Sequence, residues 1–201
     1  MHWKSIVVFS LLVLLVPSMN HLHGTTKAKL FSGFPVNNLD TGLSYATIQE
    51  AINANETLGG HRLLLDYVPF NERVVVNKSL SICGTLDLEH PETQSTINGG
   101  GAGNAMTIEV DNVTICGVSV ENGTCGIFLN HTDNCQISWG YMHVSDCTGT
   151  GIYVYYSRNC TLAYVSMFGN RYNFGVEGEF LEHFIHSIIH CTADGKPIIY
   201  M

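Results

Sequence analysis

Asn112-Val-Thr-Ile115, Asn134-Cys-Gln-Ile137 and Asn159-Cys-Thr-Leu162 are three copies of one phrase, an asparagine followed three positions later by a large apolar residue. Successive copies are 22 and then 25 residues apart. A repeat of roughly 20 to 50 residues indicates an architecture of stacked supersecondary units. These copies therefore define the repeating unit of the fold.

Two further columns follow the same spacing. The first consists of apolar residues that lie five positions after the end of each phrase, namely Val120, Met142 and Met167. The second consists of glycine-led apolar runs, namely Gly126-Ile-Phe-Leu129, Gly151-Ile-Tyr-Val154 and Gly175-Val176. Short alternating strands at this period, separated by Gly, Asn and Asp, predict an all-β fold. We expect a right-handed single-stranded parallel β-helix with coils of 22–25 residues.

The asparagine column has a structural role in such a solenoid. Asn112, Asn134 and Asn159 would lie at one corner, about 4.8 Å apart along the axis, where each amide can bond to the next. Asparagine also tolerates the left-handed backbone of tight turns. Both interpretations can hold together, and neither implies catalysis.

The first 28 residues have the pattern of a targeting segment. Lys4 precedes an uncharged, mostly apolar run from Ser5 to Val16, which Pro17 ends. The run is shorter than the roughly 20 apolar residues that span a bilayer. Residues 1–28 are therefore predicted to be a secretory signal peptide, and we expect no membrane span after its cleavage.

A helix is expected at the start of the remaining chain. Within residues 29–61, Ile48, Ala51 and Ile52 recur at helical spacing, and Ser44 is a suitable N-cap. Such a helix would cover the first coil, as solenoid ends require. Residues 62–201 are the predicted β-helix domain.

Charge and cysteine content restrict the partners and the compartment. The chain has 17 acidic and 9 basic residues and a net charge of −8. An acidic surface repels phosphate groups, which argues against nucleic acid as a partner. Seven cysteines in an exported chain leave at least one thiol free or paired between chains. The expected location is secreted, periplasmic or at the cell surface.

Several segments resemble a known family. Residues 45–55, 72–82 and 111–117, which include Tyr45-Ala-Thr-Ile-Gln-Glu-Ala-Ile and Asp111-Asn-Val-Thr-Ile-Cys-Gly117, are similar to the NosD-like proteins. These belong to the pectin-lyase-like superfamily of exported β-helices, many of them archaeal. Residues 172–176, 183–186 and 194–200 resemble the later part of the same family. The resemblance covers roughly residues 45–200 and implies the fold, with copper binding or carbohydrate binding as expected functions.

The resemblance also concerns the C-terminal end. In relatives, the phrase Asp194-Gly-Lys-Pro197 is followed by further strands, whereas this sequence stops at Met201. The β-helix is therefore expected to be truncated there, with a bare coil edge that a partner would cover.

Copper is the metal that the histidine pattern favours. His183, His186 and His190 cluster near the C-terminus, and imidazole suits copper. On a helix, these three positions share one face and could chelate an ion. On a strand, His186 and His190 would be about 13 Å apart, which is too far. Apolar spacing in residues 179–190 favours a helix, whereas the family resemblance favours another coil.

Two columns contain acidic side chains. The first consists of Asp111, Asp133 and Arg158, each one residue before an asparagine of the Asn ladder. An active site is one interpretation of this column, and a surface salt bridge between Asp and Arg of adjacent coils is the simpler one. The other column consists of Glu121, His143, Phe168 and His190. Glu121 and His143 could form an acid–base or metal pair across coils, or belong to a solvated outward face.

Aromatic and cysteine residues supply two more candidate sites. Tyr153, Tyr155 and Tyr156 offer surface of the type on which sugars stack, and by strand alternation Tyr156 should lie opposite the other two. Cys135 and Cys160 occupy the same repeat position. They predict a stacked pair, either a disulfide or two small buried apolar residues.

Three functions follow from these features. The first is a noncatalytic protein that recognises carbohydrate, a polysaccharide or cell-surface glycan, through the fold and the tyrosines. The second is a NosD-type periplasmic copper-binding accessory protein, which requires His183, His186 and His190 to converge. The third is a polysaccharide lyase or glycoside hydrolase, which requires two carboxylates about 5 to 10 Å apart.

Overall fold

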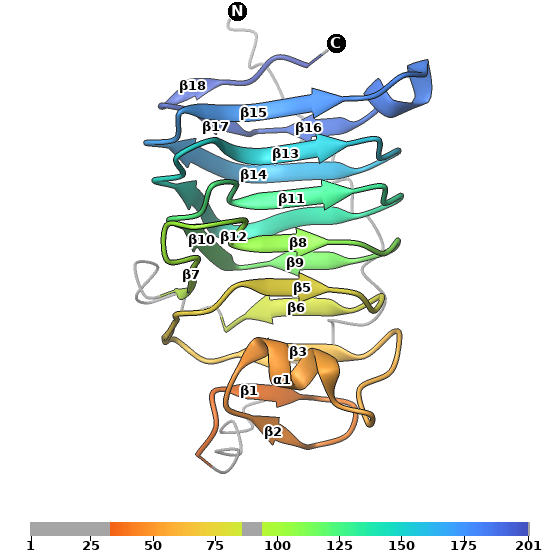
Figure 1. Cartoon of the computed structure of the whole chain (residues 1–201), viewed down its shortest axis with the longest axis vertical. Helices are drawn as coiled ribbons and strands as arrows, with labels where there is room; N and C mark the ends of the chain where they lie inside the picture. Colours follow the sequence, from red (N-terminus) through yellow and green to blue (C-terminus); the bar gives the residue numbers. More distant parts are fainter. Residues whose placement is uncertain (1–32, 86–93, 201) are drawn as a thin grey trace, which may run out of the picture. The chain divides into compact units, whose positions relative to one another are not determined.

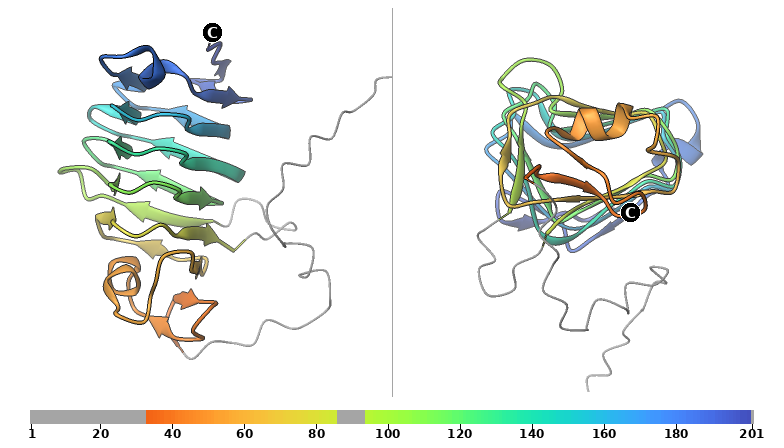
Figure 2. Two further views of the ribbon diagram at one scale, coloured as in Figure 1. Left: turned by 90° about the vertical axis from the view of Figure 1, so that its right-hand side faces the viewer. Right: turned by 90° about the horizontal axis from the view of Figure 1, so that it is seen from below.

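Parallel strands of successive coils pair from β3 (Arg62–Leu65) to β17 (Thr192–Ala193). The computed structural model describes residues 33–85 and 94–200. Within them the strands form a 13-stranded sheet and a five-stranded sheet, and the larger one turns a corner. The result is three strand faces around an enclosed core (Figures 1 and 2). The predicted all-β parallel β-helix is confirmed.

Each face is a ladder of strands, one from each coil. The first face contains β3 (Arg62–Leu65), β6 (Ser81–Gly84), β9 (Thr114–Cys116), the starts of β12 (Gln136–Ser145) and β14 (Thr161–Phe168), and β16 (Ser187–Ile189). The second contains β4 (Pro69–Phe70), β7 (Ser95–Asn98), β10 (Val118–Glu121), the ends of β12 and β14, and β17 (Thr192–Ala193). The third contains β5 (Val74–Val76), β8 (Met106–Ile108), β11 (Ile127–Asn130), β13 (Thr150–Tyr155) and β15 (Tyr172–Glu177).

Inward-facing side chains stack on similar side chains of the next coil. On the first face one stack consists of Leu63, Ile82, Ile115, Ile137, Leu162 and Ile188. Its first five members are at most 1% exposed. Burial of one such side chain stabilises the fold by roughly 1.5–3 kcal/mol. Because the cover on each residue comes from the coils above and below, no coil is stable alone.

The register of the second face differs from the prediction. We expected Val120, Met142 and Met167 in one column, but Val120 pairs with Val144, which in turn pairs with Met167. The reason is an irregularity in β12 between Ser138 and Met142, where β12 has two more residues than β14. The extra residues move every later side chain of β12 by two positions.

The glycine column is also shifted at its last member. Gly175 pairs with Tyr153 and not with Gly151 as predicted, because the coil from Ile152 to its partner Phe174 is shorter than the predicted spacing of Gly151 and Gly175. A Cβ atom at Gly175 would lie 3.0 Å from the Tyr153 ring. A side chain at this position would therefore crowd that ring.

The predicted Asn ladder lies at the corner between the third and first faces. Asn112, Asn134 and Asn159 have φ angles of 60°, 58° and 50°. The Asn159 amide donates a 2.7 Å hydrogen bond to the Asn134 side-chain oxygen. The left-handed backbone is thus present at all three asparagines, whereas the amide hydrogen bond joins only Asn159 and Asn134 within the described residues.

The N-terminal segment covers the first coil. Strand β1 (Val36–Asn38) pairs antiparallel with both β3 and β2 (Ser44–Tyr45), and helix α1 (Ile48–Asn53) follows. The helix buries Ile48, Ala51 and Ile52, as predicted. The N-cap is Thr47, not Ser44, because the Ser44 hydroxyl donates to Asn37 within the strand pair.

The C-terminal segment combines the two expected conformations. A short 3₁₀ helix, η2 (Leu181–Phe184), is followed by β16, which pairs parallel with β14. Strand β18 (Lys196–Pro197) pairs antiparallel with β17 and is the last strand of the larger sheet. Leu181, Ile185 and Ile199 are exposed in this region. A partner that covers them remains a prediction.

The predicted signal peptide, residues 1–28, lies outside the described residues. In residues 33–85 and 94–200, none of the helices has the length and apolar character that a bilayer crossing needs.

A disulfide that sequence reasoning did not predict joins two coils. Cys83 and Cys116 are paired in register on β6 and β9, with Cα atoms 4.6 Å apart. The other five cysteines are free and buried, namely Cys125, Cys135, Cys147, Cys160 and Cys191. The bonded cysteines are therefore not Cys135 and Cys160, the two that share a position in the repeat.

The apolar stack predicts a large effect of a core truncation. Ile137→Ala should lower the free energy of unfolding by about 2–5 kcal/mol, because its neighbours cannot fully close the cavity. The exposed neighbour Gln136→Ala is the matched control and should change it by less than about 0.5 kcal/mol. Urea denaturation measures both values, and similar losses in the two variants would contradict this role of the stack.

The disulfide predicts a second effect on stability. It closes a loop with a sequence separation of 33 residues, for which the chain-entropy relation gives a stabilisation of about 4 kcal/mol. The Cys83→Ser/Cys116→Ser variant should lose this amount in urea denaturation. A reducing agent should cause a similar loss in the native protein and none in the variant.

Candidate functional site

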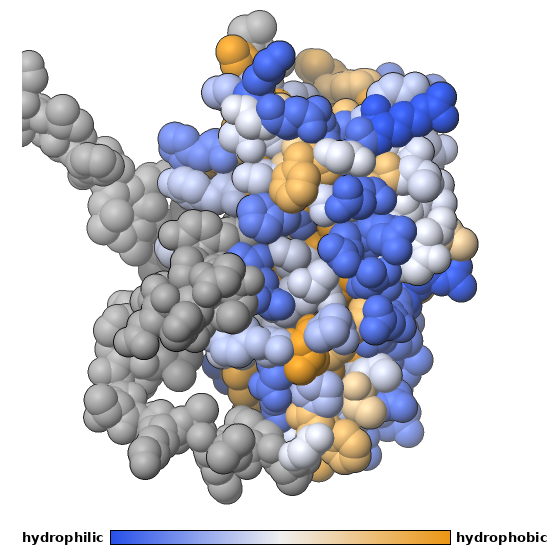
Figure 3. Space-filling model, turned by 90° about the vertical axis from the view of Figure 1, so that its left-hand side faces the viewer, coloured by the Kyte–Doolittle hydropathy of each residue, from blue (hydrophilic) through white to orange (hydrophobic). Residues whose placement is uncertain are grey.

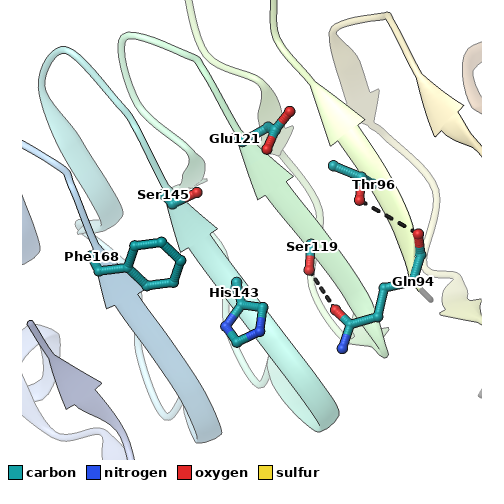
Figure 4. A pocket seen from close by; sticks show the side chains of 7 residues that line it. All are labelled: Gln94, Thr96, Ser119, Glu121, His143, Ser145 and Phe168. Carbon is teal, nitrogen blue, oxygen red and sulfur yellow. Dashed lines mark hydrogen bonds between the residues drawn. The ribbon is translucent and has the colours of Figure 1, made fainter. Parts of the chain in front are cut away.

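An open depression lies on the outward surface of the second face. Its volume is about 220 Å³. The side chains that line it come from four neighbouring strands, β7, β10, β12 and β14, and from the residue before β7 (Figure 4). The lining residues are Gln94, Thr96, Ser119, Glu121, His143, Ser145 and Phe168. We call this site the second-face depression.

Strand alternation explains why these residues share one surface. Along β10, Val118 and Val120 point into the core, so Ser119 and Glu121 point outward. The end of β12 has the same pattern, with buried Val144 between His143 and Ser145. The repeat thus places polar side chains of adjacent coils next to each other. The face drawn in Figure 3 is a mixed surface, on which hydrophobic residues lie singly or in small groups among hydrophilic ones.

A chain of amides holds the Glu121 carboxylate in place. The Asn98 side-chain nitrogen donates to it at 2.9 Å. The Asn98 side-chain oxygen accepts from the Asn122 amide at 3.1 Å and from the Gly100 backbone at 2.9 Å. These bonds fix the orientation of the carboxylate at one end of the depression, where it can accept hydrogen bonds from a ligand.

His143 supplies a polar atom without a partner. Its Nδ1 is buried and makes no hydrogen bond within residues 33–85 and 94–200. Burial lowers the pKa of the ring, so the neutral imidazole is favoured. A buried polar atom without a partner costs roughly 1–3 kcal/mol.

An aromatic ring and several hydroxyl groups complete the surface. Phe168 is 42% exposed, and its ring meets His143 edge-on with centroids 5.6 Å apart. The Ser119 hydroxyl donates to the Gln94 side-chain oxygen, while Ser145 lies directly opposite Glu121 in the sheet. An apolar ring beside hydroxyl, amide and carboxylate groups matches the mixed surface of a sugar ring.

The predicted Glu121–His143 column needs a correction. Glu121 pairs with Ser145 and not with His143, because the two extra residues of β12 shift the register. Both residues nevertheless line the same depression, diagonally across neighbouring strands. The last expected member, His190, is elsewhere and stacks on Tyr164 at a centroid distance of 5.0 Å.

The described residues place one carboxylate at the depression. Among the lining side chains in residues 33–85 and 94–200, Glu121 is the only acidic one. In the other acidic column, Arg158 binds Asp133 through a 2.6 Å salt bridge, and Asp111 accepts the backbone N–H of Asp133 at 2.7 Å. That column is therefore a surface ion pair at the Asn ladder corner, as predicted.

The three C-terminal histidines have separate environments. Nδ1 of His186 accepts the backbone N–H of Cys160 at 3.2 Å, and its Nε2 lies 2.8 Å from the His183 carbonyl oxygen. Both nitrogens of His186 are thus engaged. Nδ1 of His183 accepts two backbone N–H groups of its own 3₁₀ turn. In the part of the chain that the structure describes, no group of three or more candidate ligands could hold a metal ion.

The predicted tyrosines belong to a cluster of rings on the third face. Tyr153 stacks on Phe128 at 5.7 Å, and Tyr155 contacts both rings at 6.1 and 6.0 Å. His131 stacks on Tyr156 at 5.5 Å and meets Tyr155 edge-on at 5.3 Å. We call these five residues, Phe128, His131, Tyr153, Tyr155 and Tyr156, the aromatic surface. It extends to His183, which lies 5.2 Å from Tyr156.

The position of Tyr156 corrects the prediction that it lies opposite Tyr155. The two rings are 4.7 Å apart on the same side. The cause is the left-handed backbone of Tyr156, with φ 46°, which ends the strand and breaks the alternation. All three tyrosines are partly exposed, so none of them is part of the core.

Cys135 and Cys160 form the stacked buried pair and not a disulfide. Both are fully buried and free. The contact between the thiols lowers the pKa of Cys135 and raises that of Cys160. Their side chains point inward, whereas the bonded Cys83 and Cys116 are only partly buried on β6 and β9.

The fold and its neighbours define the class of protein. This is a right-handed β-helix with the pectin-lyase-like fold, which the pectin methylesterases also have. The pectin methylesterase from Yersinia enterocolitica matches with a TM-score of 0.56 and 13% identity, over 74% of this chain and 54% of that one. A pectin methylesterase from Aspergillus niger matches with a TM-score of 0.41 and 15% identity, over 74% of this chain and 62% of that one. At 13% identity, the likeness to the Yersinia enterocolitica protein shows the fold alone.

Sequence comparison finds a different kind of relative. The chain is 27% identical over 130 residues to a protein named cell surface glycoprotein from Methanothermus fervidus. The match covers 64% of this chain but only 19% of that protein. No family model matches the chain. NosD-like membership therefore stays an expectation from the resemblance.

Two half-buried histidines predict how stability depends on pH. Burial lowers the pKa of His143 and of His186 below the ordinary value of 6.5. The unfolded chain then binds more protons than the folded one, so the free energy of unfolding should fall as the pH drops below about 6.5. It should be unaffected by these two groups at higher pH.

Urea denaturation of variants between about pH 7 and pH 5 would measure this effect. His143→Gln and His186→Gln should each reduce the slope, and the double variant should reduce it most. A slope that His143→Gln leaves unchanged would contradict the burial of this ring.

Proposed function

We propose that this protein is a noncatalytic, carbohydrate-binding β-helix of a cell surface, and that the second-face depression holds the sugar. The observation that carries the proposal is the composition of the depression. It places the exposed ring of Phe168 beside hydroxyl groups, an oriented carboxylate and the half-buried ring of His143. A sugar presents an apolar C–H face and a rim of hydroxyl groups, which fit these two kinds of surface.

The charge of the depression restricts the type of sugar. Among the described residues that line it, Glu121 is the only acidic one, and none is Lys or Arg. The neutral form of His143 adds no positive charge near pH 7. A uronate would bring a carboxylate towards Glu121, which is unfavourable. We therefore propose a neutral or amino sugar as the ligand.

Sequence and comparisons support a surface location. The predicted signal peptide would export the chain, and the net charge of −8 suits a soluble surface that does not bind nucleic acid. The relative from Methanothermus fervidus is named a cell surface glycoprotein, although this chain spans 19% of its length. The pectin methylesterases act on a polysaccharide, as their name states, and share the fold.

The alternative functions receive less support from the geometry. A copper site would need His183, His186 and His190 to converge, and the hydrogen bonds of His186 occupy both of its nitrogens. A glycoside hydrolase would need a second carboxylate near Glu121. If Glu121 and His143 acted as an acid–base pair on a polysaccharide, an assay would detect newly formed reducing ends.

Binding to immobilised polysaccharides tests the proposal. The probes are a neutral glucan, a polymer of N-acetylhexosamine and polygalacturonate. We expect the native protein to bind one of the first two and not the third. Phe168→Ala should weaken that binding on the order of tenfold, because it removes the apolar ring on which the sugar lies.

The matched control is Phe180→Ala, which removes another exposed ring, one that contacts His183 and not the depression. It should bind like the native protein. Native protein that binds neither probe, or equal binding by Phe168→Ala and native protein, would refute the proposed function. Release of reducing ends that Glu121→Gln abolishes would refute its noncatalytic part.

A further inference from the structure

Six Asn-x-Ser/Thr sequons occur in the sequence, beginning at Asn55, Asn77, Asn112, Asn122, Asn130 and Asn159. A sequon is an acceptor for N-linked glycan in an exported chain. Composition alone produces such triplets in a solenoid rich in Asn and Thr. Their surroundings in the fold therefore have to distinguish an acceptor from a structural asparagine.

In residues 33–85 and 94–200, hydrogen bonds engage the amide nitrogens of two of these asparagines but not that of Asn130. The Asn159 amide nitrogen bonds to Asn134 in the Asn ladder, and the Asn122 amide nitrogen bonds to Asn98 beside the second-face depression. The Asn130 amide nitrogen makes no hydrogen bond within the described residues, and its oxygen lies 2.9 Å from His131 Nδ1. The contact with His131 thus holds the Asn130 side chain through its oxygen, and the amide nitrogen is left without a hydrogen bond within the described residues.

Its location distinguishes Asn130 from Asn55, Asn77 and Asn112, whose amide nitrogens also make no hydrogen bond within the described residues. Asn130 is the last residue of β11, where Ile127 and Leu129 are buried, so Phe128 and Asn130 share the outward side of the strand. Across the sheet, Asn130 pairs with Tyr155. Its free nitrogen therefore lies on the third face next to two rings of the aromatic surface.

No other sequon has this arrangement. The residues two positions before the sequon asparagines are Asn53, Val75, Val110, Val120, Phe128 and Ser157, in chain order. Only Asn130 follows an aromatic residue at this spacing, which places two side chains on one side of an extended strand. A sugar on Asn130 would have rings beside it from the moment of attachment.

We propose that Asn130 is an N-glycosylation site, and that its first sugar packs its C–H face against Phe128 and Tyr155 of the aromatic surface. In the modification, the Asn130 amide nitrogen forms a bond to the anomeric carbon of a glycan carried on a lipid phosphate. The bond from that carbon to the phosphate oxygen breaks, and one amide proton leaves. The inference rests on the export that the proposed function includes.

Two features of the fold are consistent with this modification. The sequon residue Thr132 is fully buried, so transfer takes place before this coil closes on its neighbours. The attached glycan would project from the third face, whereas the second-face depression lies on a different face. The protein's own glycan and a bound polysaccharide would thus occupy separate surfaces.

The test compares glycosylated and deglycosylated forms of the same chain. The full chain is secreted behind a host leader from a eukaryotic host that N-glycosylates, and peptide mass spectrometry determines which sequons carry glycan. We expect Asn130 to be occupied. Enzymatic removal of the glycans should lower the melting temperature of the native chain by about 2–4 °C, the shift expected for loss of a favourable surface contact in a domain of this size.

Variants identify the contact. In Asn130→Gln and in Phe128→Ala, the melting temperature should no longer fall on deglycosylation, because one lacks the glycan and the other lacks its ring. The comparison is made within each variant, so any loss of stability from the substitution itself cancels. Asn112→Gln, which removes an exposed sequon without an aromatic neighbour, is the matched control and should retain the full decrease.

Two results would overturn the proposal. One is an unmodified Asn130 in the secreted chain, whatever the other sequons carry. The other is a decrease that Phe128→Ala leaves unchanged, which would mean that the sugar does not lie on the ring. Polysaccharide binding by the second-face depression is measured separately with Phe168→Ala, so failure of that function and failure of this inference are distinguishable.

Discussion

The stacking of inward side chains in register from coil to coil is the interaction on which everything else depends. Ile115 is covered by Ile82 and Ile137, which are in turn covered by the next coils. The backbone hydrogen bonds of the parallel strands hold this register, and a slip of one residue would turn each apolar side chain outward. Because the inward residues are fixed, the outward residues of neighbouring coils are brought into rows. The depression and the aromatic surface are two such rows.

The three faces use this constraint for different chemistry. The first face carries the disulfide between Cys83 and Cys116. The second combines hydroxyl groups with Glu121 and His143, and the third carries aromatic rings. Apart from the disulfide, these outward residues lie outside the apolar core, so they can differ between faces at little cost to the fold. The ligand of this protein therefore depends on the rows of outward side chains, because the fold by itself does not identify it.

The repeat phrase predicted the fold because stacking in register requires the same residue types at the same positions of successive coils. An asparagine at each left-handed corner and an Ile or Leu at each inward position must recur once per coil, and they do so at Asn112, Asn134 and Asn159. The helix around Ile48 was predictable from its apolar spacing, but its N-cap at Thr47 was not, because Ser44 is engaged by a strand partner that the sequence does not reveal.

The candidate site was predictable only in part. Counting from the phrase placed His143 opposite Glu121, but the two extra residues of β12 leave no periodic signal, so the count was wrong by two positions. Tyr156 was misplaced because its left-handed backbone breaks the alternation that the prediction assumed. The contributions of Gln94 and Thr96 come from a coil without the phrase. Local irregularity, not the repeat itself, decided which side chains meet.

The disulfide has a mechanical consequence. The larger sheet runs from β2 at one end of the stack to β18 at the other, so residues 33 and 200 lie at opposite ends. Tension applied between these two residues would separate the coils one at a time. A released coil of about 22 residues lengthens the chain by up to roughly 75 Å. The Cys83–Cys116 bond joins two neighbouring coils covalently, so the load would pass through it and not through residues 84–115. Coils on either side of the crosslink would still peel away, but these residues would not add to the extension.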